Sequence, residues 1–211
     1  MREVCRLLDF GPLAGGYYLV TDWVAGQTVG RWRQDAPSRE RVQAVVSGVC
    51  RALGRLHASG LVHRDVHPGN IVVGPGDRVT LVDLGLGLQS DAPDRTRLTG
   101  SLVVPGTPRY LAPELVAGDV ATPASDVFSA GCIAWEILCG QAPWRHHDPV
   151  TEATMRLTLP LPSAWSAAPR LRVSEHRLLS QMLVLEPQAR LTGLSAAAAW
   201  RAMAWRTRWL G

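Results

Sequence analysis

His63-Arg64-Asp65-Val66-His67-Pro68-Gly69-Asn70 decides the fold of this chain, together with Val82-Asp83-Leu84-Gly85. A loop aspartate such as Asp65 can accept the proton of a hydroxyl group that attacks a phosphate. An asparagine and a second aspartate, here Asn70 and Asp83, can together hold magnesium beneath a triphosphate. The order and spacing of these three residues therefore indicate phosphoryl transfer.

Three later segments strengthen this interpretation. They are Gly106–Glu114 (GTPRYLAPE), Ser125–Cys132 (SDVFSAGC) and Glu186–Thr192 (EPQARLT). They resemble the end of a protein-kinase activation segment, the start of the buried helix behind the catalytic loop, and the stretch before the last helix. One His-x-Asp motif alone is a weak signal, but the ordered set is specific. The chain resembles a eukaryotic-type serine/threonine protein kinase of the kind also found in bacteria.

The resemblance implies an α+β, protein-kinase-like fold that consists mainly of the helical large lobe. Residues 1–26 are expected to be a remnant of the small lobe and hinge, and residues 27–211 the large, C-terminal lobe. A complete kinase begins with a glycine-rich loop, a strand lysine and a partner glutamate. Nothing before Leu7 matches these parts, so we expect a truncated small lobe.

The sequence contains no lysine, and all 22 of its basic residues are arginine. The ATP-binding lysine and the usual catalytic-loop lysine are therefore both missing, and His67 stands where the second is expected. Arginine does not simply replace a lysine that approaches phosphate as a compact point charge. A genome that favours arginine codons explains missing surface lysines, but it explains a missing catalytic lysine poorly.

Composition limits the class of protein. The chain has 211 residues, of which 46% are hydrophobic and 19% charged, as in one soluble globular domain. The formal charge of +4 is mild, and no arginine-rich run predicts nucleic acid as a partner. The four cysteines lack CxxC spacing, so we expect free thiols in a reducing compartment, the cytoplasm. Without a signal peptide or an apolar run of about 18 residues, no membrane association is expected.

Local patterns predict the secondary structure. Leu7 to Val24 is expected to form two strands with a hairpin at Gly15-Gly16, and residues 27–37 a short helix or turn. Ser38 is expected to cap a helix that runs to about His57. A second hairpin is expected through residues 71–73 and 79–82. The remaining expected helices are Thr122 to Cys139, Ser174 to before Pro187, and Thr192 to Leu210.

The resemblance assigns roles to the site residues. Asp65 is the candidate base, and Asn70 and Asp83 are the candidate magnesium ligands. All three residues also favour turns, but that explanation does not account for their joint spacing. Thr107 resembles the threonine that contacts the catalytic aspartate. Leu84 replaces the usual phenylalanine of the DFG triplet.

His67 has two open interpretations. A similar His-x-Asp-x-His-x-x-Asn pattern occurs in aminoglycoside-type small-molecule kinases, where histidine is compatible with phosphoryl transfer. An imidazole can donate one hydrogen bond to the transferring phosphoryl group. Alternatively, His67 only fills the space of a lost lysine. His63 is expected to be structural and to transfer no proton.

The ATP site is expected at the hinge. Thr21 aligns with the gatekeeper behind the adenine pocket. Asp22, Trp23 and Val24 would offer backbone groups to adenine. The cofactors implied by the resemblance are ATP and Mg²⁺.

Three further charged residues are expected to be structural. Asp126 is expected to be buried and to accept hydrogen bonds from the catalytic-loop backbone, while Glu114 and Arg190 form an ion pair. The C-terminal run from Trp200 to Trp209 mixes tryptophan with arginine. A helix at a membrane surface would show this pattern, but we favour a final helix that packs tryptophans onto the large lobe.

The expected reaction is transfer of the ATP γ-phosphoryl group to a protein serine or threonine, with weak or no activity in the truncated form. The first alternative is a non-catalytic pseudokinase that binds or regulates a partner, which the missing ATP lysine favours. The second is a small-molecule phosphotransferase, which only His67 suggests. The expected partners are a protein substrate or a partner kinase, and the sequence does not specify an oligomeric state.

Overall fold

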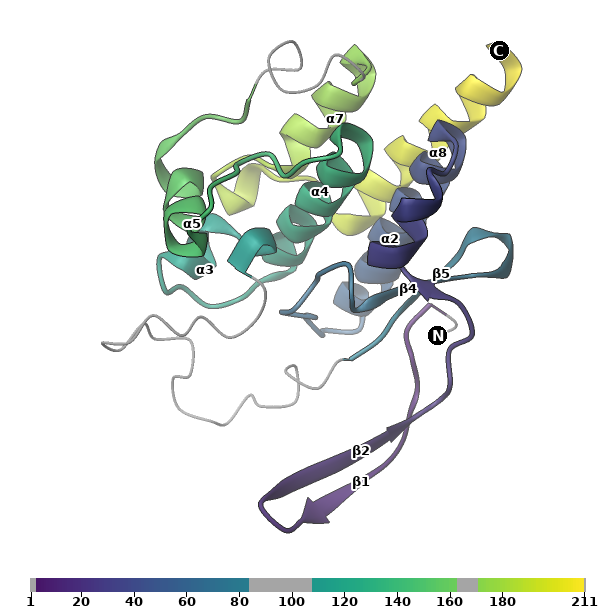
Figure 1. Cartoon of the computed structure of the whole chain (residues 1–211), viewed down its shortest axis with the longest axis vertical. Helices are drawn as coiled ribbons and strands as arrows, with labels where there is room; N and C mark the ends of the chain where they lie inside the picture. Colours follow the sequence, from purple (N-terminus) through teal and green to yellow (C-terminus); the bar gives the residue numbers. More distant parts are fainter. Residues whose placement is uncertain (1–2, 84–107, 163–170, 211) are drawn as a thin grey trace.

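Helices dominate the computed structural model, which describes residues 3–83, 108–162 and 171–210 (Figure 1). Helices α2 (Arg39–Ala58) and α8 (Gly193–Leu210) pack along each other, and α4 (Pro123–Cys139) packs against α2. A hairpin of β1 (Leu7–Leu13) and β2 (Gly16–Thr21) projects away from these helices. The architecture is the expected α+β, protein-kinase-like one.

Helix α2 follows its sequence signals. The Ser38 side chain caps it by accepting a hydrogen bond from the Arg41 backbone, and Gly60 follows it with a φ of 80°. A cap of this kind satisfies an N–H group that the first turn leaves without a partner. The apolar residues at helical spacing in α2 are buried: Val42, Val45, Val46, Val49, Leu53 and Leu56. The prediction of this helix is confirmed.

A small antiparallel sheet follows the loop that begins after α2. Its order is β3 (Gln27–Thr28), β4 (Ile71–Gly74), β5 (Arg78–Leu81). The 3₁₀ turn η2 (Pro75–Asp77) joins β4 to β5, which confirms the predicted hairpin. The N-terminal segment extends this sheet, because Leu81 N donates to Glu3 O (2.9 Å) and Cys5 N donates to Leu81 O (2.8 Å).

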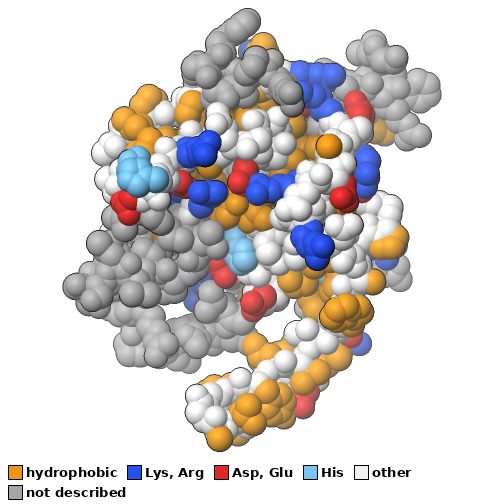
Figure 2. Space-filling model, in the orientation of Figure 1, with side chains coloured by type: hydrophobic (Ala, Val, Ile, Leu, Met, Phe, Trp, Pro, Cys, Tyr) orange, Lys and Arg blue, Asp and Glu red, His pale blue; other side chains and the backbone are white. Residues whose placement is uncertain are grey.

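The β1–β2 hairpin was predicted from Gly15-Gly16 and is confirmed. Gly15 has a φ of 86°, a left-handed conformation that glycine adopts without steric cost. The hairpin is apolar on its surface. Phe10 is 66% exposed and Tyr17 is 81% exposed. Figure 2 shows hydrophobic side chains along the projecting arm.

Helix α4 runs through the core. Thr122 and Ser125 form a capping box at its start, Pro123 occupies the first turn, and Gly140 ends it with a φ of 77°. The helix was predicted from Thr122 to Cys139, and these bounds are confirmed. Trp135 of this helix is fully buried.

The last two predicted helices are present. Helix α7 (Val173–Met182) begins one residue before the expected Ser174, because the Glu175 carboxylate accepts the Arg172 N–H (2.9 Å) and caps the first turn. In α8, Trp200 is fully buried and Trp205 is 68% exposed. At least one tryptophan therefore packs onto the helical core as expected. Among the described residues, no helix is both long and apolar enough to cross a bilayer.

Several short elements complete the fold. The expected helix or turn over residues 27–37 consists of β3 followed by α1 (Val29–Trp32) and η1 (Arg33–Asp35). Helices α3 (Pro113–Val116) and α5 (Pro149–Thr158) were not predicted. Two further 3₁₀ turns are η4 (Pro108–Tyr110) and η5 (Pro187–Ala189).

Candidate active site

Asp126 holds the catalytic loop from beneath. Its side chain is 2% exposed, and its two carboxylate oxygens accept the backbone N–H groups of His63 (2.8 Å) and Arg64 (2.9 Å). The His57 Nε2 atom lies 2.8 Å from the same carboxylate. Hydrogen bonds to an ionised acceptor are among the stronger ones in proteins. The predicted role of Asp126 is confirmed: the start of α4 fixes the backbone that leads into Asp65.

Two backbone positions at this site have uncommon conformations. Arg64 has a φ of 70° and Asp83 a φ of 59°, both in the left-handed region. Such a conformation costs a non-glycine residue about 1–2 kcal/mol. The hydrogen bond from Arg64 N to Asp126 offsets part of that cost. The backbone is therefore strained at the residue before Asp65 and at Asp83 itself.

Asn70 links the loop of Asp65 to the strand end of Asp83. Its Nδ2 atom donates to the backbone oxygen of Asp65 (3.1 Å) and to Asp65 Oδ2 (3.2 Å). Its backbone oxygen accepts the N–H of Val82 (2.9 Å), the residue before Asp83. The structure therefore brings the loop that carries Asp65 and the strand end that carries Asp83 to one place, although a hairpin separates them in sequence.

The oxygen donors here fit a magnesium ion. Because Asn70 Nδ2 is committed to Asp65, the amide oxygen Oδ1 is the atom that this side chain can offer to a metal. Asp83 is exposed and contributes a carboxylate. Mg²⁺ usually takes one or two protein oxygens and completes its shell with phosphate and water. Among the described residues, no group of three or more His, Cys, Asp or Glu side chains could hold a metal.

His67 lies beside Asp65. Its Nδ1 atom accepts the backbone N–H of Gly69 (3.1 Å), and its Nε2 atom lies 3.7 Å from Asp65 Oδ2. The second distance is too long for a direct hydrogen bond. The side chains of His67 and Asp65 are 25% and 18% exposed, so both are partly open to solvent.

His63 is fully buried behind the loop. Burial lowers the pKa of its imidazole, and the nearby charges of Asp126 and Asp65 oppose that shift without cancelling it. A buried, neutral imidazole packed against the core matches the structural role expected for this residue.

The hinge residues connect the hairpin to the helical body (Figure 1). Asp22 uses its own backbone groups: its N–H donates to Arg6 O (3.0 Å), and its carbonyl accepts the Cys5 thiol (3.2 Å). Trp23 is 93% exposed and Thr21, at the end of β2, is exposed. The Asp22 N–H is therefore already satisfied within the protein. Thr107, Leu84 and Gly85 lie outside the described residues.

The predicted Glu114–Arg190 pair is present. Arg190 Nη1 and Nη2 bind the two Glu114 oxygens at 2.6 and 2.8 Å, and Ser125 Oγ donates to the same carboxylate (2.8 Å). Burial by itself would raise the pKa of Glu114, but the hydrogen bonds from Arg190, the backbone and Ser125 hold it below its usual value. This pair ties the segment before α4 to the stretch before α8.

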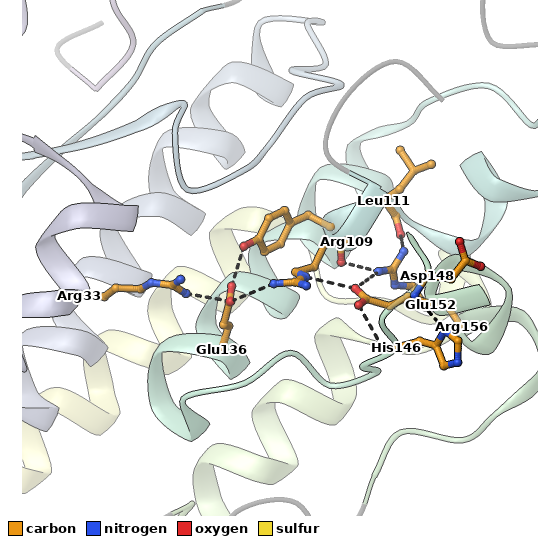
Figure 3. Close-up of polar contacts among 9 residues, drawn as sticks. Arg33, Arg109, Leu111, Glu136, His146, Asp148, Glu152 and Arg156 are labelled. Atoms are coloured by element: carbon orange, nitrogen blue, oxygen red, sulfur yellow. Dashed lines mark hydrogen bonds and ion pairs between the residues drawn. The ribbon is translucent and has the colours of Figure 1, made fainter. Parts of the chain in front are cut away.

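A polar network that sequence reasoning missed is centred on Glu136 (Figure 3). This carboxylate is 6% exposed and lies in the apolar C-terminal half of α4. Tyr110 Oη donates to Glu136 Oε2 (2.6 Å), and Arg33 Nη1 lies 2.9 Å from Oε1. Burial, with the Glu136 hydrogen bond, raises the pKa of Tyr110. A carboxylate in an apolar stretch of helix was the available signal, because buried charges require partners.

The same network continues toward α5. Arg109 Nε binds Glu152 Oε1 at 3.3 Å, and Arg156 Nη2 binds that oxygen at 3.2 Å. Arg156 also donates to the backbone oxygens of Arg109 and Leu111. Both Glu152 and Arg156 are buried. The network fixes the end of the Gly106–Glu114 segment against α4 and α5.

Comparison with known proteins supports the resemblance to protein kinases. A family model described as protein kinase domain matches residues 1–205. The serine/threonine-protein kinase PknB of Mycobacterium leprae is 35% identical over 146 residues, which are 68% of this chain and 22% of that protein. PknA of Mycobacterium tuberculosis is 38% identical over 140 residues, 66% of this chain and 31% of that kinase.

A third relative matches over more of the chain. The serine/threonine-protein kinase pknA2 of Bifidobacterium longum is 29% identical over 199 residues, 93% of this chain and 26% of that protein. The chain thus spans between 22% and 31% of the length of these curated relatives. Because the family model covers nearly the whole sequence, the chain belongs to the protein kinase domain family.

Proposed function

We propose that this chain carries the catalytic region of a serine/threonine protein kinase, which transfers the γ-phosphoryl group of ATP to a protein hydroxyl. The observation that supports this most is the linkage of Asp65 to Asn70, and of Asn70 to the strand end before Asp83. In this proposal Asp65 is the base, and Asn70 and Asp83 supply the two metal-ligand oxygens from neighbouring backbone. Such positioning is most of what phosphoryl transfer asks of a protein.

In the proposed reaction the substrate hydroxyl oxygen bonds to the γ-phosphorus as the bond from that phosphorus to the bridging oxygen breaks. ADP leaves, and the hydroxyl proton passes to Asp65. Asn70 and Asp83 would hold Mg²⁺, which would supply positive charge to offset that of the phosphates. Thr107 is proposed to contact Asp65 from the activation segment. His67 donates a hydrogen bond to the transferring phosphoryl group.

The nucleotide is proposed to lie with its adenine at the hinge, with Thr21 behind it and Asp22, Trp23 and Val24 along its edge. The Asp22 N–H is satisfied by Arg6 O, and its carbonyl accepts the Cys5 thiol. Because a carbonyl oxygen has a second lone pair, the carbonyl is the group that Asp22 would offer to adenine. The relatives named above are serine/threonine-protein kinases, which supports a protein substrate. All four cysteines are free thiols, which supports the cytoplasm as the proposed location.

The metal site can be tested even if nucleotide binding is weak. Mn²⁺ replaces Mg²⁺ in a titration of the ¹⁵N-labelled chain with ATP, and paramagnetic broadening reports the amides nearest to the metal. We expect broadening at Asn70 and Asp83 before it reaches Glu136. Asp83→Asn should remove the effect, whereas Asp119→Asn, the same change at an exposed loop residue, should not. Broadening that is uniform, or that survives Asp83→Asn, would refute the proposed ligands.

A pseudokinase is the second candidate, and one observation favours it: His67 stands where the catalytic-loop lysine is expected. The same titration separates the two functions. A pseudokinase that binds no nucleotide predicts no selective broadening at Asn70 and Asp83. Phosphorylation of an aminoglycoside in preference to a peptide would instead support a small-molecule phosphotransferase.

A further inference from the structure

The turn after the catalytic aspartate folds the His67 ring back onto its own backbone. The Asn70 N–H donates to His67 O (3.0 Å) and closes a turn with Pro68 and Gly69 at its centre. Within that turn, the Gly69 N–H donates to His67 Nδ1 (3.1 Å). A backbone N–H is always a donor, so Nδ1 must be the acceptor. The proton of a neutral imidazole then resides on Nε2.

Gly69 is the residue that makes room for this ring. A Cβ atom at position 69 would lie 2.7 Å from His67 Cε1 and 3.0 Å from Nδ1. The first distance is shorter than real Cβ contacts, so the imidazole would have to move. Gly69 is not among the glycines with positive φ, so its backbone would accept alanine. The histidine ring, and not backbone conformation, explains glycine at this position.

The ring held in this way directs its proton-bearing nitrogen toward the candidate base. Nε2 lies 3.7 Å from Asp65 Oδ2, and both side chains are partly open to solvent. We propose that Gly69 is a positioning residue that holds His67 Nδ1 as a hydrogen-bond acceptor, so that the ring proton is on Nε2. His67 then presents an Nε2–H donor beside Asp65. Its use toward a phosphoryl oxygen rests on the proposed function, but the tautomer and the role of Gly69 do not.

The tautomer can be read directly, without nucleotide. Long-range ¹H–¹⁵N spectra of the imidazoles at pH 8 distinguish a protonated Nε2 from a protonated Nδ1. We expect His67 to show the Nε2–H pattern in the unmodified chain and the averaged pattern of two exchanging tautomers in Gly69→Ala. Gly16→Ala is the matched control, because a Cβ there meets no atom within 4 Å. A protonated Nδ1, or an unchanged His67 pattern in Gly69→Ala, would overturn the proposal.

A double-mutant cycle tests whether the two residues act as a pair. Gly69→Ala should lower Tm by about 2–4 °C in the unmodified chain, the shift that one lost contact of ordinary strength gives in a domain of this size. On a His67→Ala background, where the ring is gone, the same change should have no effect. Equal losses on both backgrounds would show that Gly69 serves the backbone instead. The two proposals can fail separately. If the Nε2–H pattern and the double-mutant cycle are as expected but Mn²⁺–ATP gives no selective broadening, the proposed function is refuted and the pairing of Gly69 with His67 is retained.

Discussion

Arg190 donates hydrogen bonds to both carboxylate oxygens of Glu114, at 2.6 and 2.8 Å, although the two residues are 76 positions apart in sequence. The Arg190 side chain is fully buried and also donates to the backbone oxygens of Val184 (2.6 Å) and Leu185 (2.8 Å). The hydrogen bonds of this buried pair offset much of the free-energy cost of removing its two charges from water. It fixes the end of the segment that carries Thr107 to the base of the helical body.

Removal of this arginine should be strongly destabilising. Arg190→Ala leaves the Glu114 carboxylate buried without its main partner, so we expect the free energy of unfolding to fall by about 3–5 kcal/mol. Urea denaturation measures it. Arg41→Ala, which breaks the exposed pair with Asp77 (2.7 Å), should change stability little. Similar losses in the two variants would contradict the importance of burial here.

Stability should fall as the solution is acidified below pH 6.5. The pKa of His63 in the folded chain lies below its ordinary value of 6.5, so the unfolded chain binds a proton that the folded chain does not. The contribution is therefore fully present above pH 6.5 and is lost toward the folded pKa. Denaturation midpoints between pH 8 and pH 5 measure this.

Two comparisons assign that pH effect. His63→Phe should flatten the dependence between pH 7 and pH 5, whereas His147→Phe, at an exposed position, should leave it unchanged. Glu114 acts in a separate window: its pKa is lowered, so its stabilisation is lost only as the pH falls below about 4.5. An identical slope in His63→Phe would exclude His63 as the cause.

Tyr110 should contribute through one hydrogen bond. Tyr110→Phe removes the donor to Glu136 (2.6 Å) and leaves a buried carboxylate with one partner fewer. We expect a loss of about 1–3 kcal/mol in the free energy of unfolding. Tyr17→Phe, in the exposed hairpin, is the control. A loss below 0.5 kcal/mol, about the limit for an ordinary surface substitution, would mean that Arg33 and solvent compensate.

The polypeptide of residues 1–211 should bind Mg–ATP weakly. The sequence has no lysine for the phosphates, and Trp23 of the hinge is 93% exposed. We expect a dissociation constant in the high micromolar range or weaker, a binding free energy of at most about 5.5 kcal/mol. Isothermal titration calorimetry measures it, and low-micromolar affinity would contradict the expectation.

The same polypeptide should not phosphorylate a generic protein substrate at a useful rate. Loss of a single charge-stabilising contact commonly costs about a hundredfold in rate, and here His67 stands where the catalytic-loop lysine is expected. The measurement is ³²P transfer from ATP to a basic protein. Clear turnover that Asp83→Asn abolishes would show that the site works without that lysine.

The sequence by itself determined the elements whose burial is apolar and periodic. Helices α2 and α4 have caps at their starts and glycines just after their ends, and the apolar residues of α2 repeat at helical spacing. The family resemblance further predicted the Glu114–Arg190 pair and the burial of Asp126. These features depend on local patterns or on motifs quoted from the chain.

Tertiary structure decided the rest. Helix α5 was not predicted because two of its buried positions are Glu152 and Arg156. Charged residues there resemble a solvated surface until their partners from other elements are known. Glu136 likewise gathers partners from η1 and η4, far apart in the chain. The reason for Gly69 depends on where the His67 ring lies, a distance in space that no spacing in sequence contains.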